Sequence, residues 1–222
     1  MKILLTTCVC LVLGSCGSRA VTRQVSSPQQ NQGVGNAWLP LDVGTMWIYE
    51  GEDEGHQLRE VVVAHELTLV NGIGDCTPLW HVVYHDGVLA ERSVELLLTD
   101  VMGNVWLVGE RSWDVVADVE VETEESWRAD THEIGPFLLM PADPVVGEEL
   151  VHELPAGVET YSILNDDVSF ATPLGDFAGL LEVEEQSEPD DVDIILYRPG
   201  TGIVHERSNK GSKVIVLHRR PG

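Results

Sequence analysis

Residues 79–99 read LWHVVYHDGVLAERSVELLLT, a sequence that predicts a β-hairpin. Both arms, residues 79–85 and 88–99, are rich in β-branched, aromatic and leucine side chains. The dipeptide Asp86-Gly87 between them favours the positive φ angles of a tight turn. Helical periodicity is weak everywhere in the chain, so strands are the elements to expect.

Strand patterns of the same kind recur along the rest of the chain, with turn residues between them. In residues 115–123, Val119 and Val121 alternate with Glu120 and Glu122, which predicts a half-buried strand with an acidic outer face. The other runs are residues 57–70, 105–108, 177–185, 192–198, 202–207 and 213–218. Strands spaced about 8–12 residues apart are typical of sandwiches and barrels. The sequence therefore predicts an all-β fold, a single antiparallel β-meander domain that closes into a barrel or sandwich with little helix.

The first residues have the form of an export signal. Lys2 is followed by an apolar run of eleven residues, 3–13, which is shorter than the roughly 20 residues that span a bilayer. Leu13-Gly14-Ser15-Cys16 resembles the bacterial lipobox, whose cysteine is diacylated and becomes residue one; the alternative is an ordinary signal peptide with a chance cysteine. We expect a lipoprotein signal peptide over residues 1–15, a lipidated flexible linker over 16–37, and an acidic all-β domain over 38–222. Two or more acyl chains on Cys16 would anchor the protein to a membrane.

Charge and cysteine content limit the partners of the mature chain. The sequence has 13 basic and 37 acidic side chains, so removal of Lys2 with the signal leaves 12 against 37, a net charge of −25. Such a charge repels phosphate backbones, and we expect no nucleic-acid partner. Cys8 and Cys10 would leave with the signal, so Cys76 has no intramolecular disulfide partner. Its acidic neighbours would raise its pKa, which predicts a buried structural thiol.

Four short motifs follow one another along the predicted domain. They are Pro40-Leu41-x-x-Gly44-x-x-Trp47-x-Tyr49, Gly103-Asn104-Val105-Trp106-x-x-Gly109-Glu110, Gly175-x-Phe177 and Tyr197-x-Pro199-Gly200-x-Gly202. In this order they resemble a widespread family of uncharacterised bacterial envelope lipoproteins. The resemblance implies a β domain in the cell envelope, and it implies no activity, cofactor or catalytic residue.

The aromatic residues of these motifs have two interpretations. Trp47 and Tyr49 are two positions apart, so on a strand they share one face and can both pack in a core. Together with Trp106 and Tyr197, they either determine the fold or line a cavity for an apolar ligand.

The residues that suit metal binding are poorly arranged for it. His81 and His85 lie on one predicted strand about 13 Å apart, at roughly 3.3 Å per residue, which is too far for one zinc ion. Met102 replaces a carboxylate in the calcium-like turn that begins at Asp100, and a thioether is a poor ligand for a hard cation. Whether the acidic hairpin near Asp190 binds a divalent cation stays open. We expect no cofactor, no metal site and no catalytic residue.

Three functions are compatible with the sequence. The favoured one is a non-enzymatic, membrane-anchored envelope lipoprotein that acts as a structural or interaction domain. The first alternative is a ligand-binding β-barrel lipoprotein for a lipid-like or aromatic small molecule, and the second is an acid-dependent hydrolase. A filled interior favours the structural domain, and an apolar cavity of several hundred Å³ favours ligand binding. Gly17 stands where an aspartate retains some lipoproteins at an inner membrane, so we expect an outer-membrane location if the organism has one.

Overall fold

The computed structural model describes residues 21–22, 35–124, 126–131, 134–154, 157–188, 191–209 and 213–219. The expected signal peptide, Cys16, Gly17 and Asp190 lie outside these residues. Every regular element in the described part is a strand, which confirms the all-β prediction. Those same residues contain no helix long and apolar enough to cross a membrane.

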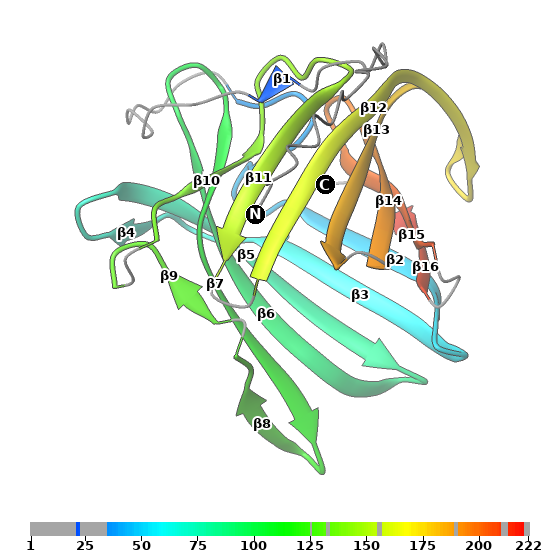
Figure 1. The fold of residues 1–222 in the computed structure, drawn as a ribbon. Helices are drawn as coiled ribbons and strands as arrows, with labels where there is room; N and C mark the ends of the chain where they lie inside the picture. The colour runs from blue at the N-terminus through cyan, green and yellow to red at the C-terminus, as the bar shows by residue number, and fades with distance from the viewer. Residues whose placement is uncertain are drawn as a thin grey trace, which may run out of the picture.

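The strands form one curled sheet (Figure 1). Their bounds are β1 (Val21–Thr22), β2 (Met46–Asp53), β3 (His56–Ala64), β4 (Thr68–Val70), β5 (Gly74–His85), β6 (Val88–Thr99), β7 (Val105–Val116), β8 (Val119–Glu122), β9 (Trp127–Arg128), β10 (Phe137–Met140), β11 (Glu148–Leu154), β12 (Gly157–Thr172), β13 (Gly175–Glu188), β14 (Asp191–Arg198), β15 (Gly202–Ser208) and β16 (Lys213–Arg219). Their order in the sheet is β1-β11-β12-β13-β14-β15-β16-β2-β3-β5-β6-β7-β10, with β4, β8 and β9 attached at β5 or β7. All described pairings are antiparallel except that of the two-residue β1 with β11.

Strands from the beginning and the end of the predicted domain pair in the middle of the sheet. Strand β2 pairs with β16, with Tyr49 opposite Leu217. The edges of the sheet are therefore β10 on one side and β11, with β1 beside it, on the other. Strands β10 and β11 are consecutive in the sequence but lie at opposite edges of the sheet, so the antiparallel meander is interrupted between them.

The predicted hairpin at residues 79–99 is present as β5 and β6. His85 pairs with Val88, and the turn residues Asp86 and Gly87 have φ angles of 51° and 80°. Positive φ at both positions matches the right-handed twist of the flanking strands, which is why this dipeptide gives a two-residue turn. Local sequence was sufficient to specify this unit.

The prediction of one half-buried strand over residues 115–123 is wrong. Strand β7 continues to Val116, the chain reverses at Ala117 and Asp118 with φ angles of 51° and 63°, and β8 returns over Val119–Glu122. All four residues of β8 are exposed, valines included. This hairpin extends beyond the rest of the sheet, as Figure 1 shows, so no second layer covers either face of it.

Strands β11 and β12 are not predicted by the sequence patterns. Strand β12 is the longest in the sheet, with 16 residues, and pairs with β13 along nearly its whole length. Its polar centre, Asn165-Asp166-Asp167, interrupts the apolar pattern. The register shifts between Ile163 and Val168, so bulges accommodate these polar residues without ending the strand.

Side chains close the sheet between β10 and β11. The ring of His152 on β11 is 2% exposed, and its Nε2 donates a hydrogen bond of 2.9 Å to the carbonyl oxygen of Leu138 on β10. The same ring packs on Phe137 at 5.0 Å and Tyr161 at 4.9 Å between ring centroids. The sheet is therefore a barrel-like layer whose last joint consists of side chains.

Candidate functional site

The curled sheet surrounds a cavity of about 590 Å³. Alternation along the strands decides which residues line it, because every second side chain points inward. Trp47 and Tyr49 on β2, Val62 and Glu60 on β3, and His81 on β5 all reach it in this way. The cavity is therefore assembled from residues distributed over the whole chain.

The lining changes from apolar to acidic along the strands. On β13 the inner face runs from Val183, a core residue, to Glu185, and on β14 it runs from Tyr197 through Ile195 to Asp193. Eight carboxylates line the cavity: Glu60, Glu95, Glu110, Glu159, Glu185, Asp191, Asp193 and Glu206. None of the described residues around it is a lysine or an arginine. The interior thus has a strongly negative part beside an apolar part.

Three of the four aromatic residues singled out in the sequence line this cavity. Trp47 donates from its indole nitrogen to the carbonyl oxygen of Thr201, and the Tyr49 hydroxyl donates to that of Ile203 at 3.2 Å. These two bonds connect β2 to the turn and strand after β14, so both side chains also position the sheet. Tyr197 is the third. Trp106 lies elsewhere: it is buried in the core and borders a smaller hollow near the β10–β11 edge.

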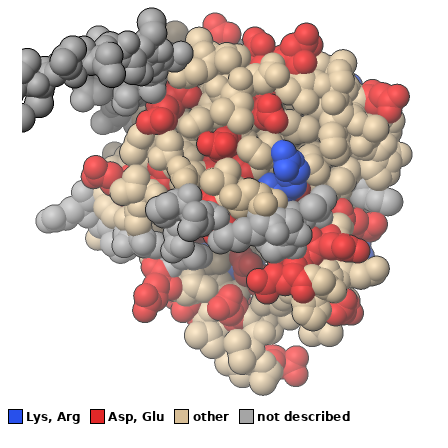
Figure 2. Space-filling view, turned by 45° about the vertical axis from the view of Figure 1, so that its right-hand side comes forward, with Lys and Arg blue, Asp and Glu red and all other residues tan. Residues whose placement is uncertain are grey.

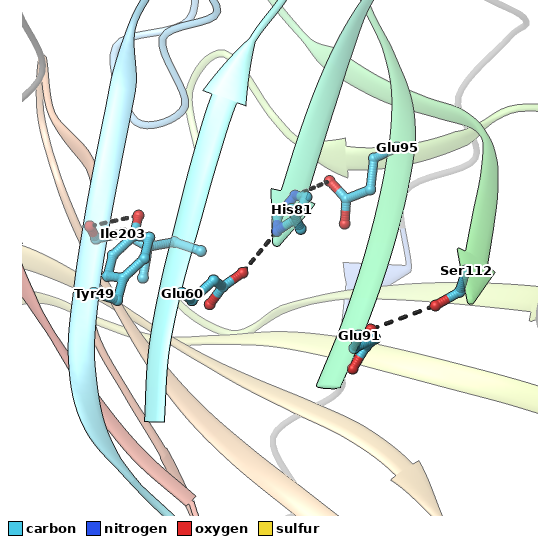
Figure 3. Close-up of polar contacts among 7 residues, drawn as sticks. All are labelled: Tyr49, Glu60, His81, Glu91, Glu95, Ser112 and Ile203. Carbon is cyan, nitrogen blue, oxygen red and sulfur yellow. Dashed lines mark hydrogen bonds and ion pairs between the residues drawn. The ribbon is translucent and has the colours of Figure 1, made fainter. Parts of the chain in front are cut away.

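His81 is held between two carboxylates (Figure 3). Its Nδ1 lies 2.7 Å from an oxygen of Glu60, and its Nε2 lies 3.7 Å from an oxygen of Glu95. Burial by itself would lower the pKa of His81, but the two carboxylates outweigh it and raise the pKa well above the ordinary value. The two carboxylates therefore favour the imidazolium form of the ring, which compensates part of their charge.

His85 belongs to a different cluster, although it shares a strand with His81. Its Nε2 is 3.4 Å from a carboxylate oxygen of Asp53, and its ring stacks on that of His56 at 5.8 Å. The two histidines of β5 therefore have separate partners. Within the described residues, no group of three or more His, Cys, Asp or Glu side chains is arranged to hold a metal ion.

Glu185 is a carboxyl of the lining whose pKa is strongly raised. It lies on β13 directly opposite Tyr161 of β12 and Asp193 of β14, and the Tyr161 hydroxyl forms a hydrogen bond with it. Burial, followed by the charge of Glu159, raises its pKa to about 8, while the Tyr161 bond acts in the opposite direction. Most Glu185 side chains are therefore protonated at neutral pH.

The Tyr197 hydroxyl is without a hydrogen bond to any described residue. The side chain is only 4% exposed and lines the cavity beside the Glu185 carboxyl, whose charge, after burial itself, raises the pKa of the tyrosine. A buried phenol normally has a hydrogen-bond partner. The Tyr197 hydroxyl does not belong to the fully buried unpaired polar atoms of the described residues, so it is accessible from the cavity.

Two other sequence candidates have structural roles. Asp100 accepts hydrogen bonds from the backbone nitrogens of Met102 and Asn104, from the Asn104 amide and from the Trp106 indole. Burial raises its pKa, these donors outweigh burial, and the net pKa is lowered. Cys76 is fully buried, and burial raises its pKa to about 12, which confirms the prediction of an inert structural thiol.

The inner carboxylates were missed as site residues. Asp191 and Asp193 belong to the acidic hairpin near Asp190, for which the sequence predicts no ligand cavity, yet both line the cavity. One sequence pattern could have revealed these carboxylates: along one face of a strand, apolar residues give way to acidic ones. On β14, for example, Ile195 shares its face with Asp193 and Asp191. This signal is visible only when each strand is divided into its two faces.

Comparisons with known proteins give structural likeness alone. No protein-family model and no curated protein matches the chain. A protein described as a lipoprotein of Parabacteroides distasonis has a TM-score of 0.45 at 14% identity, over 84% of this chain and 99% of the other. An exported protein of Bacteroides fragilis described as having a YmcC-like fold has a TM-score of 0.43 at 12% identity, over 83% and 99%. Similarity at this level carries no argument about function.

Proposed function

We propose that this chain is a lipid-anchored, non-enzymatic protein of the cell envelope that binds a small molecule inside its curled sheet. The cavity of about 590 Å³ is the observation that supports this function. Its volume falls within the roughly 300–1,000 Å³ that is usual for small-molecule sites. A filled interior would favour the structural or interaction role, so the cavity makes ligand binding the favoured function.

The chemistry of the lining modifies the ligand that the sequence suggested. A purely lipid-like or aromatic molecule would suit the apolar part, which includes Leu79, Leu107 and Ile215. The carboxylates in the rest of the cavity would remain in contact with water or with a polar group of the ligand. The ligand that fits is therefore amphipathic.

The state of His81 argues against hydrolysis. A histidine acts as a general base through an unprotonated ring nitrogen. The ring here lies between Glu60 and Glu95, which favour its protonated form, and in that form neither nitrogen has a lone pair to accept a proton. The cavity is better suited to holding a molecule than to reacting with it.

The anchor and the location rest on the sequence. The lipobox-like Leu13-Gly14-Ser15-Cys16 supports lipidation of Cys16, and Gly17 supports an outer-membrane location where the organism has one. Labelling cells with palmitate tests the anchor: the wild-type protein should take up label and the Cys16→Ala variant should not. A labelled Cys16→Ala protein would refute lipidation at this residue.

A neutral fluorescent probe tests the binding function. N-phenyl-1-naphthylamine is aromatic and uncharged at neutral pH, and it should bind the soluble domain saturably at one site. Leu154→Trp fills part of the cavity and should weaken this binding at least about tenfold. Leu164→Trp is the matched control, because Leu164 is exposed and does not line the cavity. Absence of saturable binding to the wild-type domain, or equal binding by both variants, would refute the proposal.

A further inference from the structure

We infer that the cavity takes an uncharged molecule whose apolar or aromatic body carries a hydrogen-bond-accepting oxygen, and that the Tyr197 hydroxyl donates a hydrogen bond to that oxygen. The inference names the ligand class for the proposed binding function and rests on that function. Three features of the interior carry it: a phenol that a ligand can reach, the cost of charge inside the sheet, and the apolar wall beside the phenol.

The Tyr197 hydroxyl locates the polar contact. Its side chain is 4% exposed and lines the cavity, and the hydroxyl has no hydrogen bond to a described residue. The Tyr49 hydroxyl, by contrast, donates to the carbonyl oxygen of Ile203 (Figure 3). The Tyr161 hydroxyl forms a hydrogen bond with Glu185. Of these three phenols, Tyr197 is therefore the one whose hydroxyl is available to a ligand.

The position of this hydroxyl makes it reachable from the cavity. The charges that act on it belong to Glu185 on β13, Glu206 on β15 and Glu95 on β6. Strands β15, β16, β2, β3 and β5 lie between β14 and β6 in the sheet, so these charges face the hydroxyl from different walls of the curl. The indole nitrogen of Trp127 also has no hydrogen-bond partner among the described residues, but it is fully buried. A ligand in the cavity therefore reaches Tyr197 and not this nitrogen.

The unused proton of Tyr197 requires an acceptor from outside the lining. Burial, followed by the charge of Glu185, raises the pKa of Tyr197, so the hydroxyl keeps its proton throughout the neutral range. The lining contains many acceptor oxygens, yet none of those described bonds to this hydroxyl. A carbonyl oxygen on the ligand would accept the hydrogen bond and satisfy the buried phenol.

Burial inside the sheet disfavours charge of either sign. It is the largest effect on Glu185, where burial and then the charge of Glu159 raise the pKa to about 8 and favour the neutral carboxyl. It is also the largest effect on His81, where it acts to lower the pKa and is outweighed only by two neighbouring carboxylates. A charged ligand would meet the same cost of leaving water, and an uncharged one avoids it.

The outer surface disfavours anions further. Acidic side chains are spread over the face shown in Figure 2, with few basic ones among them, and the sequence has a net charge of −24. Such a surface lowers the local concentration of anions and slows their approach. Fatty acids and phosphate esters are therefore disfavoured both at the surface and in the interior.

The body of the ligand has an apolar wall beside the phenol. Ile195 lies two residues from Tyr197 on the inner face of β14, and Ile203 lies opposite Tyr197 on β15. The ring of Trp47 borders the same cavity, and its indole nitrogen is already bonded to the carbonyl oxygen of Thr201. Trp47 therefore presents an aromatic surface without a free donor. An aromatic or cyclic ketone, ester or amide has the body and the oxygen that this arrangement requires.

Four compounds with one shared phenyl-bearing chain test the inference: 4-phenyl-2-butanone, butylbenzene, 4-phenylbutylamine and 4-phenylbutyrate. They are a neutral acceptor, a neutral hydrocarbon, a cation and an anion. Calorimetric titration of the wild-type domain at pH 7 should show the ketone binding at least about tenfold more tightly than the amine, and no measurable binding of the acid. Butylbenzene measures the contribution of the apolar body alone.

Two tyrosine variants locate the hydrogen bond. Tyr197→Phe removes the hydroxyl at nearly unchanged shape, and it should weaken binding of the ketone at least about fivefold while butylbenzene binds within about twofold of the wild type. Tyr84→Phe is the matched control, because Tyr84 lies on β5 and does not line the cavity. Infrared difference spectra supply a second measurement. The carbonyl stretch of the bound ketone should lie at lower frequency in the wild type than in Tyr197→Phe.

The outcomes separate this inference from the proposed function. If Tyr197→Phe binds the ketone as tightly as the wild type, or if the amine or the acid binds more tightly than the ketone, the inference is overturned. It is also overturned if the ketone does not bind while N-phenyl-1-naphthylamine does, and in each of these cases binding of that probe still supports the cavity as a site. If neither the probe nor any of the four compounds binds, the proposed function fails as well.

Discussion

Replacement of Glu185 by glutamine should change how the stability of the domain depends on pH. The pKa of this carboxyl rises from 4.5 to about 8 on folding, because burial and the charge of Glu159 disfavour its ionised form. Between these two values the folded protein binds more protons than the unfolded chain does. The contribution of Glu185 to the free energy of unfolding must therefore fall as pH rises from about 4.5 to 8, and it levels off above that.

The magnitude follows from the size of the pKa change. Each pKa unit corresponds to about 1.4 kcal/mol, so ionisation of Glu185 costs the folded state at most about 5 kcal/mol. Water in the cavity screens part of this cost, and about 2–5 kcal/mol is the expected range. Glutamine cannot ionise and still accepts a hydrogen bond from the Tyr161 hydroxyl. The Glu185→Gln variant should match the wild type near pH 5 and be about 2–5 kcal/mol more stable at pH 9.

Urea unfolding followed by tryptophan fluorescence, at half-unit steps from pH 5 to 9, measures this difference. The slope of free energy against urea should be equal for both proteins, so that the midpoints compare stability directly. The Glu184→Gln protein serves as control and should follow the wild-type curve. Parallel curves for wild type and Glu185→Gln, within about 0.5 kcal/mol at every pH, would refute the assignment of a buried, perturbed carboxyl.

Three further predictions concern the core, the edge joint and the surface. Asp100→Ala should destabilise the domain by about 2–4 kcal/mol, because it leaves the buried Trp106 indole and other donors without an acceptor. Urea unfolding at pH 7 measures this loss of stability. A loss below about 1 kcal/mol would contradict the prediction. His152→Phe should cost about 1–2 kcal/mol at pH 8 through the unpaired Leu138 carbonyl. Because burial lowers the pKa of His152, the wild type alone loses stability below pH 6.5, so the two unfolding curves should converge there. Sodium chloride should raise the melting temperature smoothly by screening the negative charge, with calcium adding little at equal ionic strength; a rise of several degrees at sub-millimolar calcium would contradict this.

The parts of the fold that follow from sequence are those encoded over short distances. The hairpin of β5 and β6 is fixed by two runs and the turn Asp86-Gly87, so it could be predicted. The pairing of Tyr49 with Leu217 joins opposite ends of the chain, and no local pattern encodes it. The curl of the sheet and the cavity inside it depend on that pairing. The sequence predicts the curl only as a barrel or sandwich, and it does not decide whether the interior is filled or contains a cavity.

The candidate site was predictable in its aromatic half and not in its acidic half. Trp47 and Tyr49 are large and two apart, which marks an inner face whatever the fold. Asp193 and Glu185 belong to runs of acidic residues that are ordinarily exposed to water. Only the assembled sheet shows that one face of each run lines an enclosed space. A chain of net charge −24 contains too many carboxylates for their position to be inferred from composition.

The joint between β10 and β11 determines where this sheet can widen at least cost. Separating any other neighbouring strands of the curl breaks a ladder of backbone hydrogen bonds, whereas these two are connected in the described structure by the His152 bond and by ring contacts. Residues 141–147 tie the strands at one end, so they part most easily at the other, where Leu154 borders the cavity. The curled sheet is therefore open along one line, between β10 and β11. Opening at this joint would leave the backbone-paired strands of the described sheet intact.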